Sequence, residues 1–186
     1  MRLFLAIKIS EEIRWSLEQW LKELRPLASK AKWVRTENLH VTLKFLGEVP
    51  TETLAPLQEA LAPIQASTAL TLNFRGLGFF PGEMRPSILW LGIQSTATLS
   101  RLARDIDRTT HQLGFPAEGR PFTPHLTLAR FQPPGLAPEL QQAVSRNKNR
   151  DFGRLTTGEF QLLESKLRPS GAEYTTLQAF HCVPES

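Results

Sequence analysis

The chain has 186 residues, of which 41% are hydrophobic and 22% are charged, with 22 Lys and Arg against 18 Asp and Glu. This composition is typical of a folded globular protein and excludes a largely disordered one. The length is enough for one well-packed domain or for two small lobes that share an interface. The net charge of +4 favours an anionic partner such as a phosphate or a nucleic acid, although many cytoplasmic proteins are equally basic.

The cysteine content and the N-terminal sequence indicate in which cellular compartment the protein is expected. The single cysteine, Cys182, has no partner for an internal disulfide. The apolar run LFLAI spans five residues before Lys8 interrupts it, which is too short for a signal peptide or a membrane span. We therefore expect a protein of the reducing cytoplasm that does not contact a membrane.

Hydrophobic periodicity predicts alternating strands and helices in the first half of the chain. Residues 2–9 are apolar and rich in strand-forming residues, and Ser10 then begins a helix as its N-cap. A short strand at KWV and a longer one at HVTLKFLGEV follow. A helix is expected over 51–64, and extended strands over 68–80 and 87–93.

The second half repeats parts of this order. A helix is expected over 96–113, with Leu113 pointing inward and Gly114 ending the helix. A strand at HLTLARF, a short helix near 137–145 and two closing strands, EFQLLESKL and YTTLQAFHC, complete the chain. The segment RNKNRD is expected to be a solvated polar loop.

This order predicts an α+β fold, because several strands lie close enough in sequence to be antiparallel neighbours. The halves partly mirror each other, with HVTL at 40–43 and HLTL at 125–128 in equivalent places. No Gly/Ser-rich or Pro-rich linker separates them. We expect residues 1–186 to form a single bilobal domain with an internal duplication. Its two pseudo-symmetric lobes, each an antiparallel sheet flanked by helices, would enclose an active-site cleft.

The two repeated tetrapeptides place polar side chains together. Alternate side chains of a strand share a face, so His40 and Thr42 point the same way, as do His125 and Thr127. If the strands lie in opposed lobes, the two pairs face each other across the cleft. The alternative is two surface strands in which His and Thr occur by chance. The similar sequences of the two motifs and their equivalent positions in the two halves disfavour this alternative.

Two histidines opposed across a cleft suit phosphoryl transfer without a metal. A neutral imidazole accepts a proton from attacking water while a protonated one donates to the departing alkoxide, and a pKa of about 6.5 makes both forms available. Threonine hydroxyls donate to phosphoryl oxygens that gain charge in the transition state. The motifs therefore predict a base, an acid and two hydrogen-bond donors.

The two motifs and their surroundings resemble the two-histidine phosphoesterase superfamily, and within it the RNA 2′,3′-cyclic phosphodiesterases, also called 2′-5′ RNA ligases. HVTLKFLGEV and RPFTPHLTLARF carry the resemblance, and MRLFLAI, GLGFFP, LWLGI and GAEYTTLQAF extend it in family order over nearly the whole chain. The resemblance implies a bilobal α+β fold. It also implies enzymes that open a terminal 2′,3′-cyclic phosphate to a 2′-phosphate without metal or cofactor, with a reverse ligase activity.

Carried onto this sequence, the resemblance implies that His40 is the general acid and that His125 is the general base. Thr42 and Thr127 would hold the phosphoryl oxygens. Two near-symmetric histidines can exchange roles when the reaction runs backwards, so the order of acid and base stays open. The implied partner is RNA with 2′,3′-cyclic phosphate ends, such as tRNA fragments, and the protein is expected to be a monomer.

Three further residues are weaker candidates for substrate contacts. Lys44 shares a face with His40 by strand alternation and is expected to meet phosphate or to lie in solvent. Alternation places Arg130 on the face of the strand away from His125. Arg130 nevertheless ends the strand, and the family motif has arginine there, which favours a contact with the substrate. Alternation places Phe45 toward the core, with stacking on a nucleobase as the alternative.

Other features do not predict sites. His111 lies off the apolar face of its helix and is expected at the surface. His181 lies beside Cys182, but no carboxylate or second cysteine stands at ligand spacing, so no metal site is expected. The sequence has no G-x-x-x-x-G-K-[ST] loop, which disfavours an ATP-dependent ligase.

Two alternatives to an RNA phosphodiesterase stay open. The same four residues would serve a relative that acts on a small cyclic nucleotide, such as ADP-ribose 1″,2″-cyclic phosphate, or on 2′-5′ oligonucleotides. A non-catalytic RNA-binding module is disfavoured, because a pure binder needs no proton-transfer groups.

Overall fold

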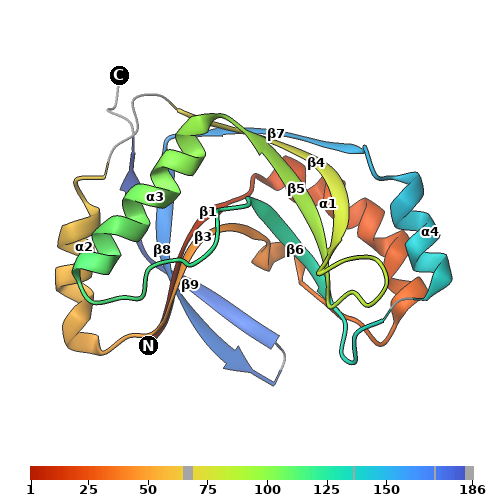
Figure 1. Ribbon diagram of the computed structural model, residues 1–186, viewed down its shortest axis with the longest axis horizontal. Helices are drawn as coiled ribbons and strands as arrows, with labels where there is room; N and C mark the ends of the chain where they lie inside the picture. The colour runs from red at the N-terminus through yellow and green to blue at the C-terminus, as the bar shows by residue number, and fades with distance from the viewer. Residues whose placement is uncertain (65–68, 136, 170, 183–186) are drawn as a thin grey trace.

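The computed structural model of the chain describes residues 1–64, 69–135, 137–169 and 171–182. Within these residues the chain forms two antiparallel sheets with helices packed against them (Figure 1). The elements are, in chain order, β1 (Arg2–Lys8), α1 (Glu11–Leu24), η1 (Arg25–Ala28), β2 (Lys32–Trp33), η2 (Thr36–Asn38), β3 (His40–Glu48), η3 (Thr51–Thr53), α2 (Leu54–Leu61), β4 (Leu70–Phe80), β5 (Ile88–Ser95), α3 (Ala97–Gln112), β6 (His125–Arg130), α4 (Pro138–Arg146), β7 (Asp151–Thr157), β8 (Glu159–Arg168) and β9 (Gly171–His181).

Each sheet combines strands from both halves of the chain. The first sheet has the order β3-β1-β8-β9, and the second has the order β2-β6-β5-β4-β7. β1 therefore pairs with β8 from the end of the chain, and β4 pairs with β5 and β7. The predicted α+β fold with two antiparallel sheets is confirmed, but neither sheet corresponds to one half of the sequence.

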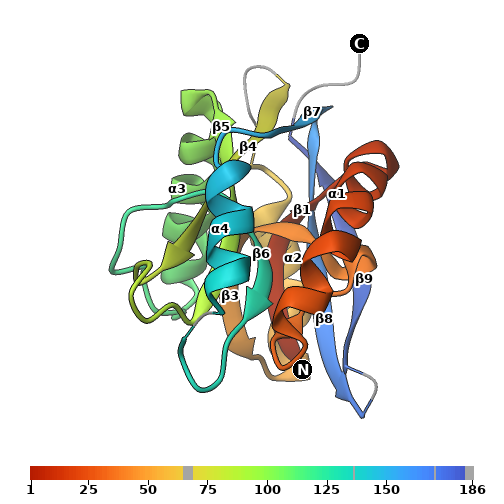
Figure 2. The ribbon, with the colours of Figure 1, turned by 90° about the vertical axis from the view of Figure 1, so that its right-hand side faces the viewer.

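The helices also connect the two sheets, because a helix can pack against the sheet that does not contain the strand before it. α1 follows a strand of the first sheet but packs against β7 of the second, and α3 follows a strand of the second sheet and packs against β3 of the first as well as against β4. Figure 1 shows α2 with α3 at one end of the molecule, and Figure 2 shows α1 and α4 together at the other. Among the described residues, no helix combines the length and apolar composition that crossing a membrane requires.

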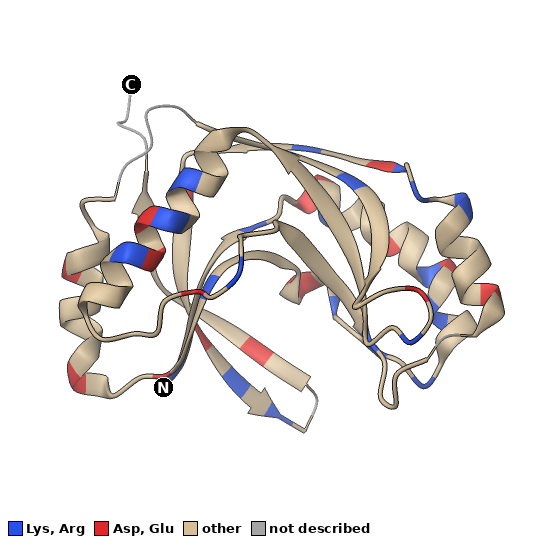
Figure 3. Ribbon diagram, in the orientation of Figure 1, with Lys and Arg blue, Asp and Glu red and all other residues tan. Residues whose placement is uncertain are grey.

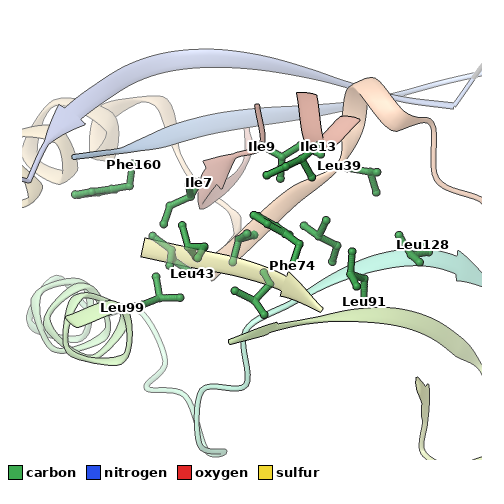
Figure 4. Packing of buried hydrophobic residues seen from close by; sticks show 14 of the residues in the cluster. Ile7, Ile9, Ile13, Leu39, Leu43, Phe74, Leu91, Leu99, Leu128 and Phe160 are labelled. Atoms are coloured by element: carbon green, nitrogen blue, oxygen red, sulfur yellow. The ribbon is translucent and has the colours of Figure 1, made fainter. Parts of the chain in front are cut away.

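A large apolar cluster joins the two sheets and the helices. Ile7 and Leu43 of the first sheet lie in the same cluster as Phe74 and Leu91 of the second (Figure 4). Full burial of such a side chain contributes about 1.5–3 kcal/mol. A separate small cluster of Phe4, Ala6 and Leu163, with Tyr174 packed against it, supports the first sheet elsewhere.

Local sequence explains the helix ends. The Ser10 hydroxyl accepts a hydrogen bond from the backbone N–H of Ile13, which caps α1 as predicted. Gly114 has a φ of +91° directly after the last turn of α3, a backbone conformation that favours glycine. Leu113, expected to point inward, is 36% exposed because it follows the last helical residue.

Several boundaries and one strand differ from the prediction. The helix expected over 51–64 begins with the 3₁₀ turn η3, and only Leu54–Leu61 is α-helical. The strand expected over 68–80 is observed from Leu70 onward, while residue 68 lies outside the described part of the chain. β7 was not predicted at all, and it begins at Asp151, the last residue of the expected RNKNRD loop. It is an edge strand in which only Phe152 is buried, and it contains Gly153, so its sequence carries little strand signal.

Candidate active site

The two predicted motifs lie on strands that meet between the sheets. β3 is an edge strand of the first sheet, and β6 of the second is covered at its outer edge only by the two-residue β2. β3 also packs against β6. A cavity of about 690 Å³, here called the catalytic cavity, opens at this junction and is lined by all four motif residues, His40, Thr42, His125 and Thr127.

Each histidine is held by a carbonyl group two residues before it. Nδ1 of His40 lies 2.7 Å from the carbonyl oxygen of Asn38, and Nδ1 of His125 lies 2.8 Å from that of Thr123. A carbonyl oxygen only accepts hydrogen bonds, so Nδ1 is the donor in both rings. Nε2 is therefore the ring nitrogen that remains for proton exchange.

His40 rests against aromatic side chains of the first sheet. Its ring centroid lies 4.7 Å from that of Phe4 and 5.2 Å from that of Tyr174, which meets it edge-on. Burial lowers the pKa of His40 below its ordinary value of 6.5, and the hydrogen bond to Asn38 opposes this shift only in part. Without a bound anion, this environment favours the neutral imidazole.

His125 is supported by a different aromatic group. The ring of Phe80 meets it edge-on at a centroid distance of 5.4 Å, and Phe80 lies 5.3 Å from the ring of Trp90. Trp90 packs directly on Gly78, where an added Cβ would lie 2.3 Å from the indole ring. A side chain at position 78 would therefore displace Trp90 and disturb the packing behind His125.

Both histidine strands carry a β-bulge three residues after the histidine. The pairing of β3 with β1 skips Leu43, and the pairing of β6 with β5 skips Leu128. An extra residue in one strand reverses the alternation of the side chains that follow it. Lys44 and Phe45 of β3 and Ala129 and Arg130 of β6 therefore face the opposite way from a regular strand, and a second shift in β3 skips Leu46.

The bulges bring Phe45 and Arg130 into the catalytic cavity, five residues after their respective histidines. Phe45 is 62% exposed, so the expectation that it points into the core is wrong. Arg130 lines the same cavity as His125, whereas regular alternation places it on the opposite face. The two strands thus present an aromatic ring and a guanidinium group at equivalent positions.

The same bulge turns Lys44 away from the catalytic cavity. Its side chain is 1% exposed, and its ammonium group forms an ion pair with Asp107 of α3 and donates to the carbonyl of Pro116 at 2.9 Å. Neither a contact with substrate phosphate nor a solvated position, the two expectations for Lys44, agrees with this arrangement. Burial raises the pKa of Asp107, but hydrogen bonds from Lys44 and from the backbone N–H of Glu118 outweigh it and hold the pKa below 3.8.

Sequence reasoning missed residues that reach the catalytic cavity from distant segments. Arg2 of β1 and Tyr174 of β9 line it. Burial raises the pKa of Tyr174, and the positive charges of Arg130 and Arg2 oppose this shift. The side chain of Asn38 donates to the carbonyl of Ala172 at 2.6 Å, which attaches the start of β9 to η2, directly before β3. Asn38 lies two residues before His40, whereas Arg2 and Tyr174 lie within MRLFLAI and GAEYTTLQAF, so their position beside or within these stretches is the signal that could have identified them.

The other two histidines lie outside the catalytic cavity. His111 is exposed on α3, as predicted. His181 is 62% exposed, and its Nδ1 lies 4.0 Å from a carboxylate oxygen of Glu159. Within residues 1–64, 69–135, 137–169 and 171–182, no group of three or more His, Cys, Asp and Glu side chains is placed to hold a metal ion.

Comparison with known proteins identifies the family. The family described as LigT like Phosphoesterase matches the chain twice, over residues 7–90 and 91–174, and each match contains one motif. The RNA 2′,3′-cyclic phosphodiesterase of Archaeoglobus fulgidus is 36% identical over 180 residues, which cover 97% of this chain and 99% of the relative. The protein of the same name from Thermus thermophilus is 35% identical over 190 residues, covering 97% and 89%.

Solved structures agree with this relationship. TT0787 of Thermus thermophilus superposes with a TM-score of 0.80 at 33% identity and covers 98% of both chains. E. coli LigT complexed with 3′-AMP superposes with a TM-score of 0.77 at 28% identity and covers 97% of both chains. The fold, the two family matches and these similarities along the whole length show that the chain belongs to the LigT-like phosphoesterase family.

Proposed function

We propose that the protein is a metal-independent RNA 2′,3′-cyclic phosphodiesterase that opens the terminal cyclic phosphate to a 2′-phosphate. The proposal rests chiefly on one cavity lined by two histidines and two threonines, in which each histidine keeps Nε2 for proton exchange. Relatives that match along nearly the whole chain bear the name of this activity.

In the proposed reaction, Nε2 of His125 accepts a proton from water while the water oxygen attacks phosphorus. The bond between phosphorus and O3′ breaks, and protonated Nε2 of His40 donates its proton to O3′. Thr42 and Thr127 donate hydrogen bonds to the non-bridging oxygens, where negative charge increases. The anionic substrate raises the pKa of buried His40, so binding itself favours the protonated acid.

Other residues of the catalytic cavity would bind the end of the RNA, for example that of a tRNA fragment. Phe45 presents an exposed ring on which a base stacks. Arg130 and Arg2 supply positive charge to the same cavity. If the 5′-hydroxyl of a second RNA replaces water as the nucleophile, the same groups form a 2′-5′ linkage.

The direct test is the product formed from RNA that ends in a 2′,3′-cyclic phosphate, incubated with the protein in EDTA. We expect complete conversion to the 2′-phosphate, identified by ³¹P NMR and by chromatography against both monophosphate standards. A 3′-phosphate product would contradict the assignment of O3′ as leaving group. Activity that disappears in EDTA and returns with a divalent cation would contradict metal independence.

The pH dependence should report both histidines. We expect a bell-shaped profile of kcat/KM, because one histidine must be protonated and the other neutral. One of its two apparent pKa values should lie below 6.5, because burial lowers the pKa of His40 in the free enzyme. The corresponding value in the kcat profile should be higher, because bound phosphate stabilises the imidazolium. A rate that is flat between about pH 5 and 9 would contradict the mechanism.

A further inference from the structure

A second and larger cavity adjoins the catalytic cavity. It has a volume of about 1070 Å³ and shares four lining residues with the catalytic cavity, Thr42, Phe45, Ile88 and His125. By itself this second cavity is slightly larger than the range of about 300–1000 Å³ that is typical of sites for one small ligand. The two cavities together therefore exceed the needs of a single nucleotide.

The loop between α3 and β6 forms a wall of the second cavity. This loop contributes Glu118, Arg120 and Phe122 to the lining, and α3 contributes Ser100 and Arg104. Figure 3 shows basic positions both on α3 and on this loop. The wall therefore combines hydroxyl, aromatic and guanidinium groups, which are the groups that bind single-stranded nucleic acid.

The buried ion pair described above holds this wall in place. Lys44 of β3 donates to the carbonyl of Pro116, and the carboxylate of Asp107 accepts from the backbone N–H of Glu118 at 3.0 Å. The loop is thus attached to both the first sheet and α3. A wall that is already ordered loses little conformational entropy when a ligand binds.

Two arginines dominate the charge of the second cavity. Arg104 and Arg120 are exposed, and no acidic side chain of the described residues lies within ion-pair distance of either. Glu118 adds one negative charge, whereas Lys44 and Asp107 neutralise each other. The lining therefore keeps a net positive charge, which favours an anionic ligand.

We propose that the second cavity binds the nucleotide that precedes the one bearing the cyclic phosphate. An RNA end of this kind continues only through its 5′-oxygen, which carries a phosphodiester. Arg104 and Arg120 contact that phosphodiester, while Phe45, shared by both cavities, stacks on a base at their junction. The inference rests on the proposed function and adds a preference for an oligonucleotide over a cyclic mononucleotide.

The test compares 2′,3′-cyclic AMP with a dinucleotide and a trinucleotide that end in the same cyclic nucleotide. For the wild type we expect kcat/KM to be about tenfold higher for the longer substrates, the size that two exposed ion pairs give together. The double variant Arg104→Ala/Arg120→Ala should lose this advantage and keep its activity on 2′,3′-cyclic AMP. Arg101→Ala is the matched control, because Arg101 is an exposed residue of α3 outside both cavities.

Salt dependence gives a second readout. For single-stranded nucleic acid, the slope of log affinity against log salt changes by about 0.7 for each neutralised phosphate. The double variant should therefore show a shallower slope than the wild type with the trinucleotide, and the same slope with 2′,3′-cyclic AMP. Thermal unfolding checks that the variants are folded, and Arg104→Gln/Arg120→Gln replaces the alanine pair if that pair is unstable.

Two results would overturn the inference. One is equal kcat/KM of the wild type for the mononucleotide and the longer substrates. The other is an equal loss of activity on all substrates in the double variant. If no cyclic phosphate is turned over, the proposed function fails, and fluorescence anisotropy with a labelled trinucleotide 2′-phosphate then decides the inference separately. Binding about tenfold weaker in the double variant would support the second cavity as an RNA site, and unchanged binding would refute it.

Discussion

Replacing His125 by alanine is expected to lower kcat/KM for RNA with a 2′,3′-cyclic phosphate by about 10²–10⁴-fold, the usual contribution of one proton-transfer group. His40→Ala should cause a loss in the same range, because both rings line one cavity and each keeps Nε2 for proton exchange. The measurement is initial turnover at pH 7, with thermal unfolding to show that each variant is folded. His181→Ala is the control, since His181 is exposed and lies outside the catalytic cavity.

The double variant His40→Ala/His125→Ala shows whether the two histidines act in the same catalytic step or contribute independently. If the histidines act in one step, removal of the second should cost much less than removal of the first, because groups that act as a unit are not additive. Losses that multiply would indicate separate roles. Turnover within a few-fold of wild type in either single variant would contradict the two-histidine mechanism.

Asp107→Asn is expected to lower the free energy of unfolding by about 3 kcal/mol, because it leaves the ammonium group of Lys44 buried without its counter-charge. Chemical denaturation at pH 7 measures this loss. Asp105→Asn is the matched control on the same helix: its carboxylate pairs with Arg108, whose side chain is 73% exposed, so the loss should stay below about 1 kcal/mol. A loss below about 1 kcal/mol for Asp107→Asn would contradict the role of the buried pair.

The pH dependence of this stabilisation has a defined sign. The pKa of Asp107 is lower in the folded protein than its ordinary 3.8, so the carboxylate stabilises the fold fully above that value. The stabilisation is lost as the pH falls through the folded pKa, and the difference between wild type and Asp107→Asn should shrink there. Lys44→Met/Asp107→Leu should recover most of the stability, because neither buried charge remains.

The wrong expectation for Lys44 and the wrong facing that alternation gives Phe45 and Arg130 have one physical cause. Strand alternation predicts which face of the sheet a side chain lies on only while each residue pairs with one residue of the neighbouring strand. It is correct for His40 with Thr42 and for His125 with Thr127, because both pairs precede the bulge of their strand. At Leu43 and at Leu128 the pairing skips a residue, and the facing of the next residues reverses. Whether a strand accommodates an extra residue depends on the strand beside it, and the local sequence does not show this.

The sequence by itself determined most helices and strands, the repetition of the two motifs and the common facing of histidine and threonine within each. These features follow from periodicities of two and 3.6 residues, which are local properties of the chain. Only the tertiary structure decided that each sheet takes strands from both halves, that bulges admit Phe45 and Arg130, and that Arg2 and Tyr174 complete the catalytic cavity. These features depend on pairing between segments far apart in sequence, and no local pattern encodes which distant strand becomes a neighbour.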